Sequence, residues 1–421
     1  SYMKEVILVF SKNNEPVIIR NDKFKKCLLF ISFPIYNYKE EELKVLGDIL
    51  YERSEKYDTK RKVAVACINN YCLFYRYQIT YIGNNAFLEF MLSYPSFNSL
   101  KKDVLLDNLL FAKEMIFNPY LENGSFPRNI IDEDIRMYKD NVKHKLKNYD
   151  SYYQSKSNAL IDEDNYLISS FFRDLSLLDS ITSERLYDVY REIISKKPLV
   201  FLIGDVNENE SKELIKKIIL DNEISNIKFK TDYHVYVKDI VNDVKVVRED
   251  SDFSTSGVYC NYKVKDMNCY KDEVLLSVVR KLLSSNNSDL LFKYLRKDND
   301  LVYNAGAYAY SFGTLTLFSF VGKKNIDKVF ELYDKAMNDI SDIHYIESKL
   351  PFFVEDAKID SELDKENLNI ILFEYVREYL GNNHEKYYDV INNIKPIEVK
   401  NFIDNRLVMV SKYIGVGVDD E

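Results

Sequence analysis

The predicted order of strands and helices occurs twice along the chain, and this repetition limits the possible folds more than any other feature. In each half, strands alternate with amphipathic and long helices, and a last helix and a buried strand close the half. Residues 181–204 form the closing segment of the first half, and residues 395–410 form that of the second. We therefore predict an α+β protein with two homologous domains, each a mostly antiparallel sheet packed against helices.

The predicted domains are residues 3–225 and 251–421, joined by a polar linker at 226–250 that is rich in Asp, Lys and Asn. In the first domain the patterns predict a paired strand couple, a helix at 40–51 and a β-hairpin of residues 63–67 and 72–81. In the second domain they predict a strand, two helices and a hairpin, at residues 257–264, 271–283, 290–295, and 303–312 with 315–321.

Composition excludes several classes of protein. Of 421 residues, 46% are hydrophobic, enough for sizeable cores, and the net charge of −9 argues against a general nucleic-acid binder. No uninterrupted apolar run approaches the roughly 20 residues that cross a bilayer, so we expect a cytoplasmic protein without a membrane segment. The cysteines are odd in number and form no Cys-x-x-Cys, which favours a reducing compartment and small apolar packing roles: Cys27, Cys67, Cys72, Cys260 and Cys269.

The common catalytic motifs are absent from the sequence. None of the four histidines stands in a zinc motif, and there is no G-x-G-x-x-G, Walker loop or G-x-S-x-G. His344 precedes Glu347 by three residues, which predicts a solvated pair at the start of a helix. An enzyme of another class, with a cysteine or a pair of carboxylates at its centre, remains an alternative.

Residues 288–303 carry the most suggestive polar pair, because a helix there runs into a strand. Arg296 is a fixed cation with a planar fork of donors, and Tyr303 offers a phenol hydroxyl. Together the two could bind a substrate carbonyl as it becomes an oxyanion. The other interpretation is structural: the arginine pairs with a nearby acid, and the tyrosine packs in a core.

The whole ordered set of segments resembles the pitrilysin/insulinase-type zinc peptidases with an inverted zinc motif, in their short two-domain class. Leu-Leu-Phe-Ala-Lys-Glu-Met-Ile-Phe-Asn-Pro at 109–119, followed by a charged helix at 131–146, is similar to the segment that leads to the helix with the third metal ligand. Residues 180–186 with 202–206 resemble the family's domain-closing helix and strand. Arg296 and Tyr303 stand in a context close to the family's Leu-Arg…Tyr. This resemblance implies a chain that forms half of a clamshell.

The zinc motif of that family is degenerate here. Lys44, Gly47 and Asp48 stand where His, Glu and His are required, and no histidine occurs before His144. A protonated lysine cannot bind zinc, and glycine lacks the carboxylate that activates water. We therefore expect no metal or cofactor in this chain and no activity of the chain alone.

The resemblance implies a role in a bacterial two-chain peptidase. In the family, the Arg/Tyr pair of one half faces the zinc of the other. The chain would be the non-catalytic subunit of a heterodimer, with Arg296 and Tyr303 acting in trans on small unfolded peptides. Its partner would be a homologous subunit that carries His-x-x-Glu-His and the zinc. The family adds extended peptides to a sheet edge, and residues 63–67 stand near that strand. A peptide-binding scaffold or a homodimeric pseudoenzyme is the alternative.

Overall fold

The computed structural model describes residues 5–8, 15–35, 38–82, 85–161, 175–221, 227–230, 236–237, 240, 243–380 and 385–418. Two compact units make up the chain, and each is assembled from separate segments. Unit 1 contains residues 1–139, 174–233 and 364–384, and unit 2 contains residues 140–173, 234–363 and 385–421. The domain limits at 225 and 251 remain a prediction from the sequence.

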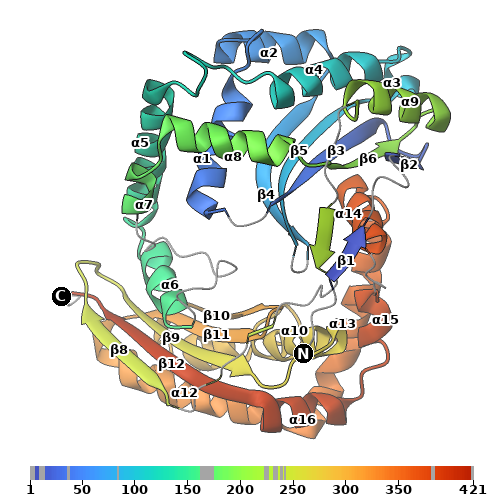
Figure 1. Cartoon of the computed structure of the whole chain (residues 1–421). Coiled ribbons are helices and arrows are strands. Elements are labelled where there is room, and N and C mark those ends of the chain that lie inside the picture. Colours follow the sequence, from blue (N-terminus) through green and yellow to red (C-terminus); the bar gives the residue numbers. More distant parts are fainter. Residues whose placement is uncertain are drawn as a thin grey trace. The chain divides into compact units, whose positions relative to one another are not determined.

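Unit 1 is built on a five-stranded sheet with the strand order β2-β6-β3-β5-β4 (Figure 1). The β2–β6 pair is parallel and the other pairs are antiparallel. The strands are β2 (Val17–Arg20), β3 (Lys26–Ile35), β4 (Phe74–Ile82), β5 (Asn85–Pro95) and β6 (Leu199–Gly204). A separate antiparallel pair joins β1 (Glu5–Leu8) to β7 (Ile227–Lys230).

Unit 2 repeats this topology. Its sheet has the order β10-β11-β9-β12-β8, again with one parallel pair, β12–β8. The strands are β8 (Lys245–Asp250), β9 (Ser256–Val264), β10 (Val302–Tyr310), β11 (Thr314–Val321) and β12 (Leu407–Val416). Taken in chain order, β2 to β6 therefore correspond one by one to β8 to β12. The predicted α+β fold with two homologous domains is confirmed.

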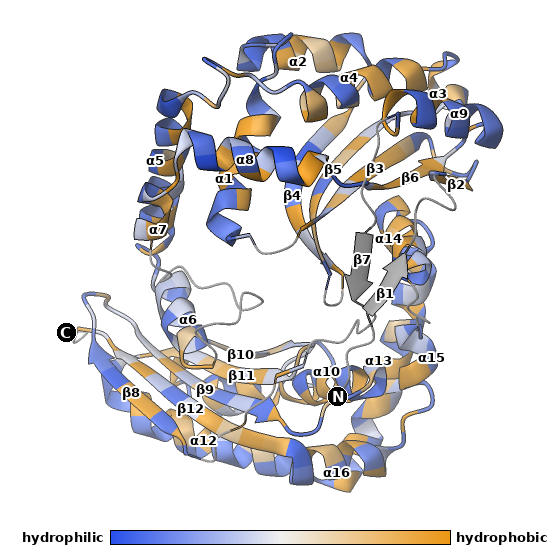
Figure 2. Ribbon diagram, in the orientation of Figure 1, coloured by the Kyte–Doolittle hydropathy of each residue, from blue (hydrophilic) through white to orange (hydrophobic). Residues whose placement is uncertain are grey.

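Helices cover one face of each sheet and bury leucine, isoleucine, valine and phenylalanine side chains against it. Figure 2 shows hydrophobic and hydrophilic residues alternating along these helices, as expected for helices that bury one side. In unit 1 the helices are α1 (Glu40–Glu52), α2 (Lys60–Asn69), α3 (Phe97–Leu100), α4 (Leu105–Phe117), α5 (Arg128–Lys145), α7 (Ser176–Asp179), α8 (Ser183–Ile194) and α9 (Glu208–Ile218). In unit 2 they are α10 (Tyr270–Leu283), α11 (Leu290–Phe292), η1 (Lys293–Lys297), η2 (Lys323–Asn325), α12 (Ile326–Asp339), α13 (Ile343–Asp364), α15 (Tyr387–Ile391) and α16 (Pro396–Arg406). Among the described residues, no helix is long and apolar enough to cross a membrane.

The other face of the unit 2 sheet is covered by α6 (Tyr149–Ala159). Gly257 and Gly415 are paired across β9 and β12, and the ring of Tyr153 lies directly on both. A Cβ atom at Gly257 would come within 2.4 Å of Tyr153 Cδ2, so only glycine leaves room for the ring. This close approach explains why residues 140–173 belong to unit 2 although the unit 1 sheet closes later in the sequence.

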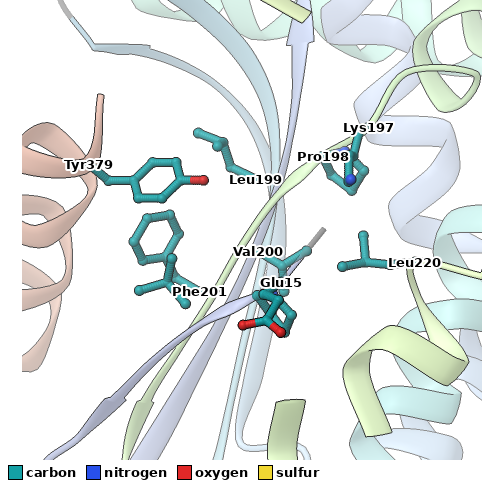
Figure 3. A pocket seen from close by; sticks show the side chains of 10 residues that line it. Glu15, Lys197, Pro198, Leu199, Val200, Phe201, Leu220 and Tyr379 are labelled. Atoms are coloured by element: carbon teal, nitrogen blue, oxygen red, sulfur yellow. The ribbon is translucent and has the colours of Figure 1, made fainter. Parts of the chain in front are cut away.

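The corresponding face of the unit 1 sheet is covered by α14 (Leu368–Tyr379). Its buried face includes Leu372 and Val376, which pack with Phe30 of β3. Tyr379 meets Phe201 of β6 edge to face, with ring centroids 5.4 Å apart, beside a small cavity (Figure 3). That cavity has a volume of about 10 Å³, which is room for about one water molecule and for no peptide or cofactor.

Two expectations about the first domain are wrong. Residues 63–67 lie in helix α2, because Thr59 caps the helix by accepting a hydrogen bond from the Lys62 amide (3.2 Å). The edge strand on this side of the sheet is therefore β4. The first two strands do not pair with each other either: β1 pairs with β7, and β2 pairs with β6.

The predicted linker at 226–250 contains two strands, β7 and β8. Strand β8 is an outer strand with the sequence Lys-Val-Val-Arg-Glu-Asp, and its side chains are mostly exposed. Charged residues are common on outer strands because they discourage further pairing. This composition makes such a strand resemble a linker in the sequence.

Candidate functional site

The degenerate metal positions lie on α1, in unit 1. Lys44 and Asp48 are one helical turn apart, and the Lys44 Nζ atom lies 3.3 Å from Asp48 Oδ2. The same ammonium group lies 5.1 Å from the centre of the Tyr138 ring on α5. If the expected correspondence holds, a lysine cation occupies the first of the two histidine positions of the zinc motif.

Gly47 stands at the expected glutamate position, between Lys44 and Asp48. It is buried and faces the sheet. A Cβ atom there would lie 3.5 Å from Tyr77 Cβ of β4 and 3.9 Å from Leu88 Cδ1 of β5. These are ordinary van der Waals distances, so a methyl group fits. Packing against the sheet therefore does not require glycine at this position, and the residue offers no group for proton transfer.

Asp134 on α5 completes this cluster, and the sequence reasoning did not identify it. Burial raises the pKa of Asp134 to about 7, and the negative charge of the neighbouring Asp48 acts in the same direction. The positive charge of Lys44 opposes this rise. The resemblance of residues 131–146 to the helix with the third metal ligand was the sequence signal that pointed to α5. It did not indicate which residue of the helix would lie at the site.

These side chains do not fit a zinc ion. Zinc sites use histidine, cysteinate or carboxylate ligands, whereas here an ammonium group is ion-paired to one of the two carboxylates. Across the described ranges, no group of three or more His, Cys, Asp or Glu side chains could hold a metal ion. No catalytic step is derived for zinc in this chain.

Arg296 lies in unit 2, in the π-helical segment η1 just before strand β10. Its side chain is 45% exposed, and its Nη1 atom donates to the Val302 carbonyl (2.9 Å) and pairs with Asp300 Oδ1 (3.1 Å). Both interactions use Nη1. In the part of the chain that the structure describes, Nε and Nη2 have no partner and remain available as donors.

Contacts with the core and with α12 fix the position of the segment that carries Arg296. Leu295 is fully buried, and the hydroxyl of Tyr294 donates to the Asp339 carboxylate on α12. Asn299 also donates from Nδ2 to the Tyr294 carbonyl (2.6 Å). The π-helical turn thus directs one side of η1 into the core and leaves Arg296 on the surface.

Tyr303 follows at the start of β10, where the pairing with β11 shifts register between Val302 and Asn304. Such a bulge alters the direction of a side chain, and Tyr303 is 59% exposed. The Arg296 bond to the Val302 carbonyl fixes the guanidinium beside the residue that precedes Tyr303. Arg296 thus contacts the residue next to Tyr303 in the sequence. Neither the guanidinium nor the phenol is buried in a core.

Strands β4 and β10 are each at the end of their sheet, β4 paired with β5 and β10 with β11. Arg76 on β4 forms an ion pair with Glu89 on β5, with 3.2 Å between Arg76 Nε and Glu89 Oε2. The Glu89 side chain is fully buried. Burial raises the pKa of the Glu89 carboxyl, and the charge of Arg76 opposes this effect. An extended peptide could add to the β4 edge of unit 1 or to the β10 edge of unit 2, each of which is one of the two edges of its sheet.

Other expected positions have structural explanations. His344 is 87% exposed at the start of α13, and its Nδ1 atom lies 3.4 Å from Glu347 Oε2, so the predicted solvated pair is confirmed. His234 and His384 lie outside the described residues. Cys27 and Cys260 are buried as predicted, but Cys269 is exposed. Cys67 and Cys72 are neighbours in space, because the Cys72 amide donates to the Cys67 carbonyl (2.9 Å), although their spacing is not that of Cys-x-x-Cys.

Comparison with known proteins agrees with these features. Residues 180–345 match the peptidase M16 inactive domain, a stretch that includes Arg296 and Tyr303. A probable inactive metalloprotease of Bacillus subtilis, YmfF, is 26% identical over 265 residues. That match spans 59% of this chain and 59% of the relative, so the chain matches well under two thirds of the relative's length.

Two solved structures share the fold over nearly the whole chain. A conserved protein from Enterococcus faecalis is 19% identical, covers 100% of both chains and has a TM-score of 0.83. A protease from Helicobacter pylori is 12% identical, covers 99% of both chains and has a TM-score of 0.73. These comparisons make the chain peptidase-like. It is similar to the inactive members of the M16 peptidases in residues 180–345 and in its match to the Bacillus subtilis relative, and it has the fold of the two solved proteins.

Proposed function

We propose that this chain is the non-catalytic subunit of a heterodimeric zinc peptidase and supplies Arg296 and Tyr303 to the zinc site of a homologous partner. The observation that carries this proposal is the exposed Arg296 guanidinium, with Nε and Nη2 unpartnered among the described residues, beside the exposed Tyr303. A chain with Lys44, Gly47 and Asp48 at the metal positions needs another source of zinc.

In the proposed reaction, the partner's zinc activates a water molecule that attacks the scissile carbonyl of a peptide. The carbonyl oxygen becomes negatively charged, and donors held ready at that point stabilise it. Arg296 would offer Nε and Nη2, because Nη1 is engaged by Val302 and Asp300. Tyr303 would offer its phenol hydroxyl.

The proposed substrates are small unfolded peptides in the cytoplasm. An extended peptide could add to the edge of β4 or β10, so that backbone hydrogen bonds supply affinity without a demand for one sequence. The same edges favour a second candidate function, in which the chain is a peptide-binding scaffold or a homodimeric pseudoenzyme and has no peptidase partner.

The test is to purify the chain with a homologous His-x-x-Glu-His subunit from the same genome and to measure cleavage of a quenched fluorescent peptide. We expect Arg296→Ala and Tyr303→Phe to lower kcat by roughly tenfold or more, as for loss of an oxyanion donor. Assembly, measured by size-exclusion chromatography, should not change. Lys297→Ala removes a neighbouring exposed charge and Tyr310→Phe removes another phenol on β10, so both should cleave normally.

Full turnover in both the Arg296 and Tyr303 variants would contradict the role in trans. Peptide binding and self-association of the chain alone, without any complex with a zinc subunit, would favour the scaffold. Chelator-insensitive cleavage by the chain alone would instead indicate an enzyme of another class.

A further inference from the structure

The C-terminal end of helix α2 brings two cysteines together by a defined backbone motif. After the cap residue Asn70, Tyr71 adopts the left-handed conformation with φ of 58°. The Cys72 amide then donates to the Cys67 carbonyl (2.9 Å), and the Tyr71 amide donates to the Ile68 carbonyl (3.2 Å). These two bonds form a Schellman motif, in which the residue two places after the cap contacts the residue three places before it.

In this helix the two contacting positions are Cys72 and Cys67. Each side chain shifts the pKa of the other, the Cys72 thiol donates to the Phe74 carbonyl (3.4 Å), and both sulfurs are free thiols. The 2.9 Å backbone bond keeps their Cα atoms within roughly 7 Å, the upper end of the span of a disulfide. Disulfide formation thus requires little movement of the backbone.

The two thiols differ in acidity in a way that suits exchange chemistry. The Cys72 side chain lowers the pKa of the Cys67 thiol, and the same contact raises the pKa of Cys72. Both residues are partly exposed. Burial instead raises the pKa of Cys27 to about 11 and that of Cys260 to about 12, so these thiols are poor nucleophiles.

We propose that Cys67 and Cys72 form a reversible disulfide by exchange with a low-molecular-weight disulfide such as oxidised glutathione. The Cys67 thiolate attacks one sulfur of the small disulfide, which breaks its S–S bond and releases the first small thiolate. Cys72 then loses its proton, and its sulfur attacks Cys67 and releases the second thiolate. In total, two protein thiols are oxidised, and one small disulfide is reduced to two small thiols.

The disulfide would join Cys67 in the last turn of α2 to Cys72, which lies two residues before the start of the outer strand β4. The Leu73 amide donates to the Ser93 carbonyl (2.8 Å), which begins the pairing of this segment with β5. Asn108 Nδ2 donates to the Asn70 carbonyl (2.8 Å) and fixes the turn to α4. A loop this short gains little stability from a crosslink, so the bond acts locally, on the turn that leads into the sheet edge.

The test uses the full chain incubated with increasing ratios of oxidised to reduced glutathione until the exposed Cys269 is fully modified. After alkylation of the remaining thiols, trypsin releases residues 63–76, which contain both cysteines and no internal lysine or arginine. We expect this peptide to be lighter by two hydrogen atoms and unalkylated. Peptides with Cys27 and Cys260 should stay reduced.

Three variants separate the disulfide from unspecific oxidation. Cys67→Ser and Cys72→Ser should each abolish the lighter peptide, whereas Cys269→Ser should leave it unchanged. Cys72→Ala should also slow alkylation of Cys67 at neutral pH by several-fold, because it removes the side chain that lowers the pKa of the Cys67 thiol. A fully reduced peptide 63–76 in a sample whose Cys269 is modified would overturn the proposal, as would a stable glutathione adduct on Cys67 with Cys72 still free.

Discussion

The Nζ atom of Lys44 lies 3.3 Å from the Asp48 carboxylate, and these are the two residues that the sequence resemblance places at the positions of the zinc-binding histidines. The cation at this place is part of the chain, and it balances one carboxylate while Asp134 is held nearby on α5. The arrangement brings α1 and α5 into contact, and the ionised form of Asp134 is disfavoured there by burial and by the charge of Asp48.

Zinc binding should be recoverable by replacing the two motif positions. Lys44→His combined with Asp48→His places two imidazoles one turn apart on α1, and Asp134 supplies a carboxylate as the third ligand. We expect zinc affinity at least about tenfold above that of the wild-type chain, measured by competition with a zinc indicator. Adding Asp134→Asn to this double variant should remove most of the gain. Equal affinities of all three proteins would show that α5 does not supply the ligand.

The stability of unit 1 should depend on pH through Asp134. Its pKa in the folded chain is about 7, above its ordinary value of 3.8, so folding favours the protonated carboxyl. This contribution is complete below pH about 4 and is lost as the pH rises towards about 7, because the unfolded chain ionises first. Asp134→Asn stays neutral and should therefore gain on the order of 1–3 kcal/mol relative to wild type between pH 4 and pH 8. Urea unfolding at several pH values measures this difference, and parallel curves would contradict the prediction.

Gly47→Ala should stabilise the protein. The residue lies inside α1, the new methyl group would lie 3.5 Å from Tyr77 Cβ, and alanine favours helix over glycine by roughly 0.5–1 kcal/mol. Gly257→Ala is the opposite control, because its methyl group would lie 2.4 Å from Tyr153 Cδ2, and we expect a loss of about 1–3 kcal/mol. Denaturation midpoints of both variants test the pair. A lower midpoint for Gly47→Ala would show that α1 cannot accommodate a Cβ at this position.

Local signals in the sequence predicted many of the elements well. The helix expected at 183–194 has those limits in the structure, because the Thr182 side chain accepts a hydrogen bond from the Arg185 amide (3.1 Å). Thr59 caps α2 in the same way, but the apolar residues of 63–67 alternate as in a strand, and the strand predicted there is wrong. That helix buries only Val63 and Ala66, so its hydrophobic pattern is too short to show a helical period.

The sequence by itself determined two properties: the duplicated α+β architecture, and the absence of any His-x-x-Glu-His motif. Both are written in the order of residues along the chain, and neither requires knowledge of distant contacts. Only the tertiary structure brought Asp134 to Asp48, placed Tyr153 over Gly257 and Gly415, and left Arg296 on the surface with two available donors. These features depend on how side chains far apart in the sequence pack, and periodicity and capping signals carry no information about such contacts.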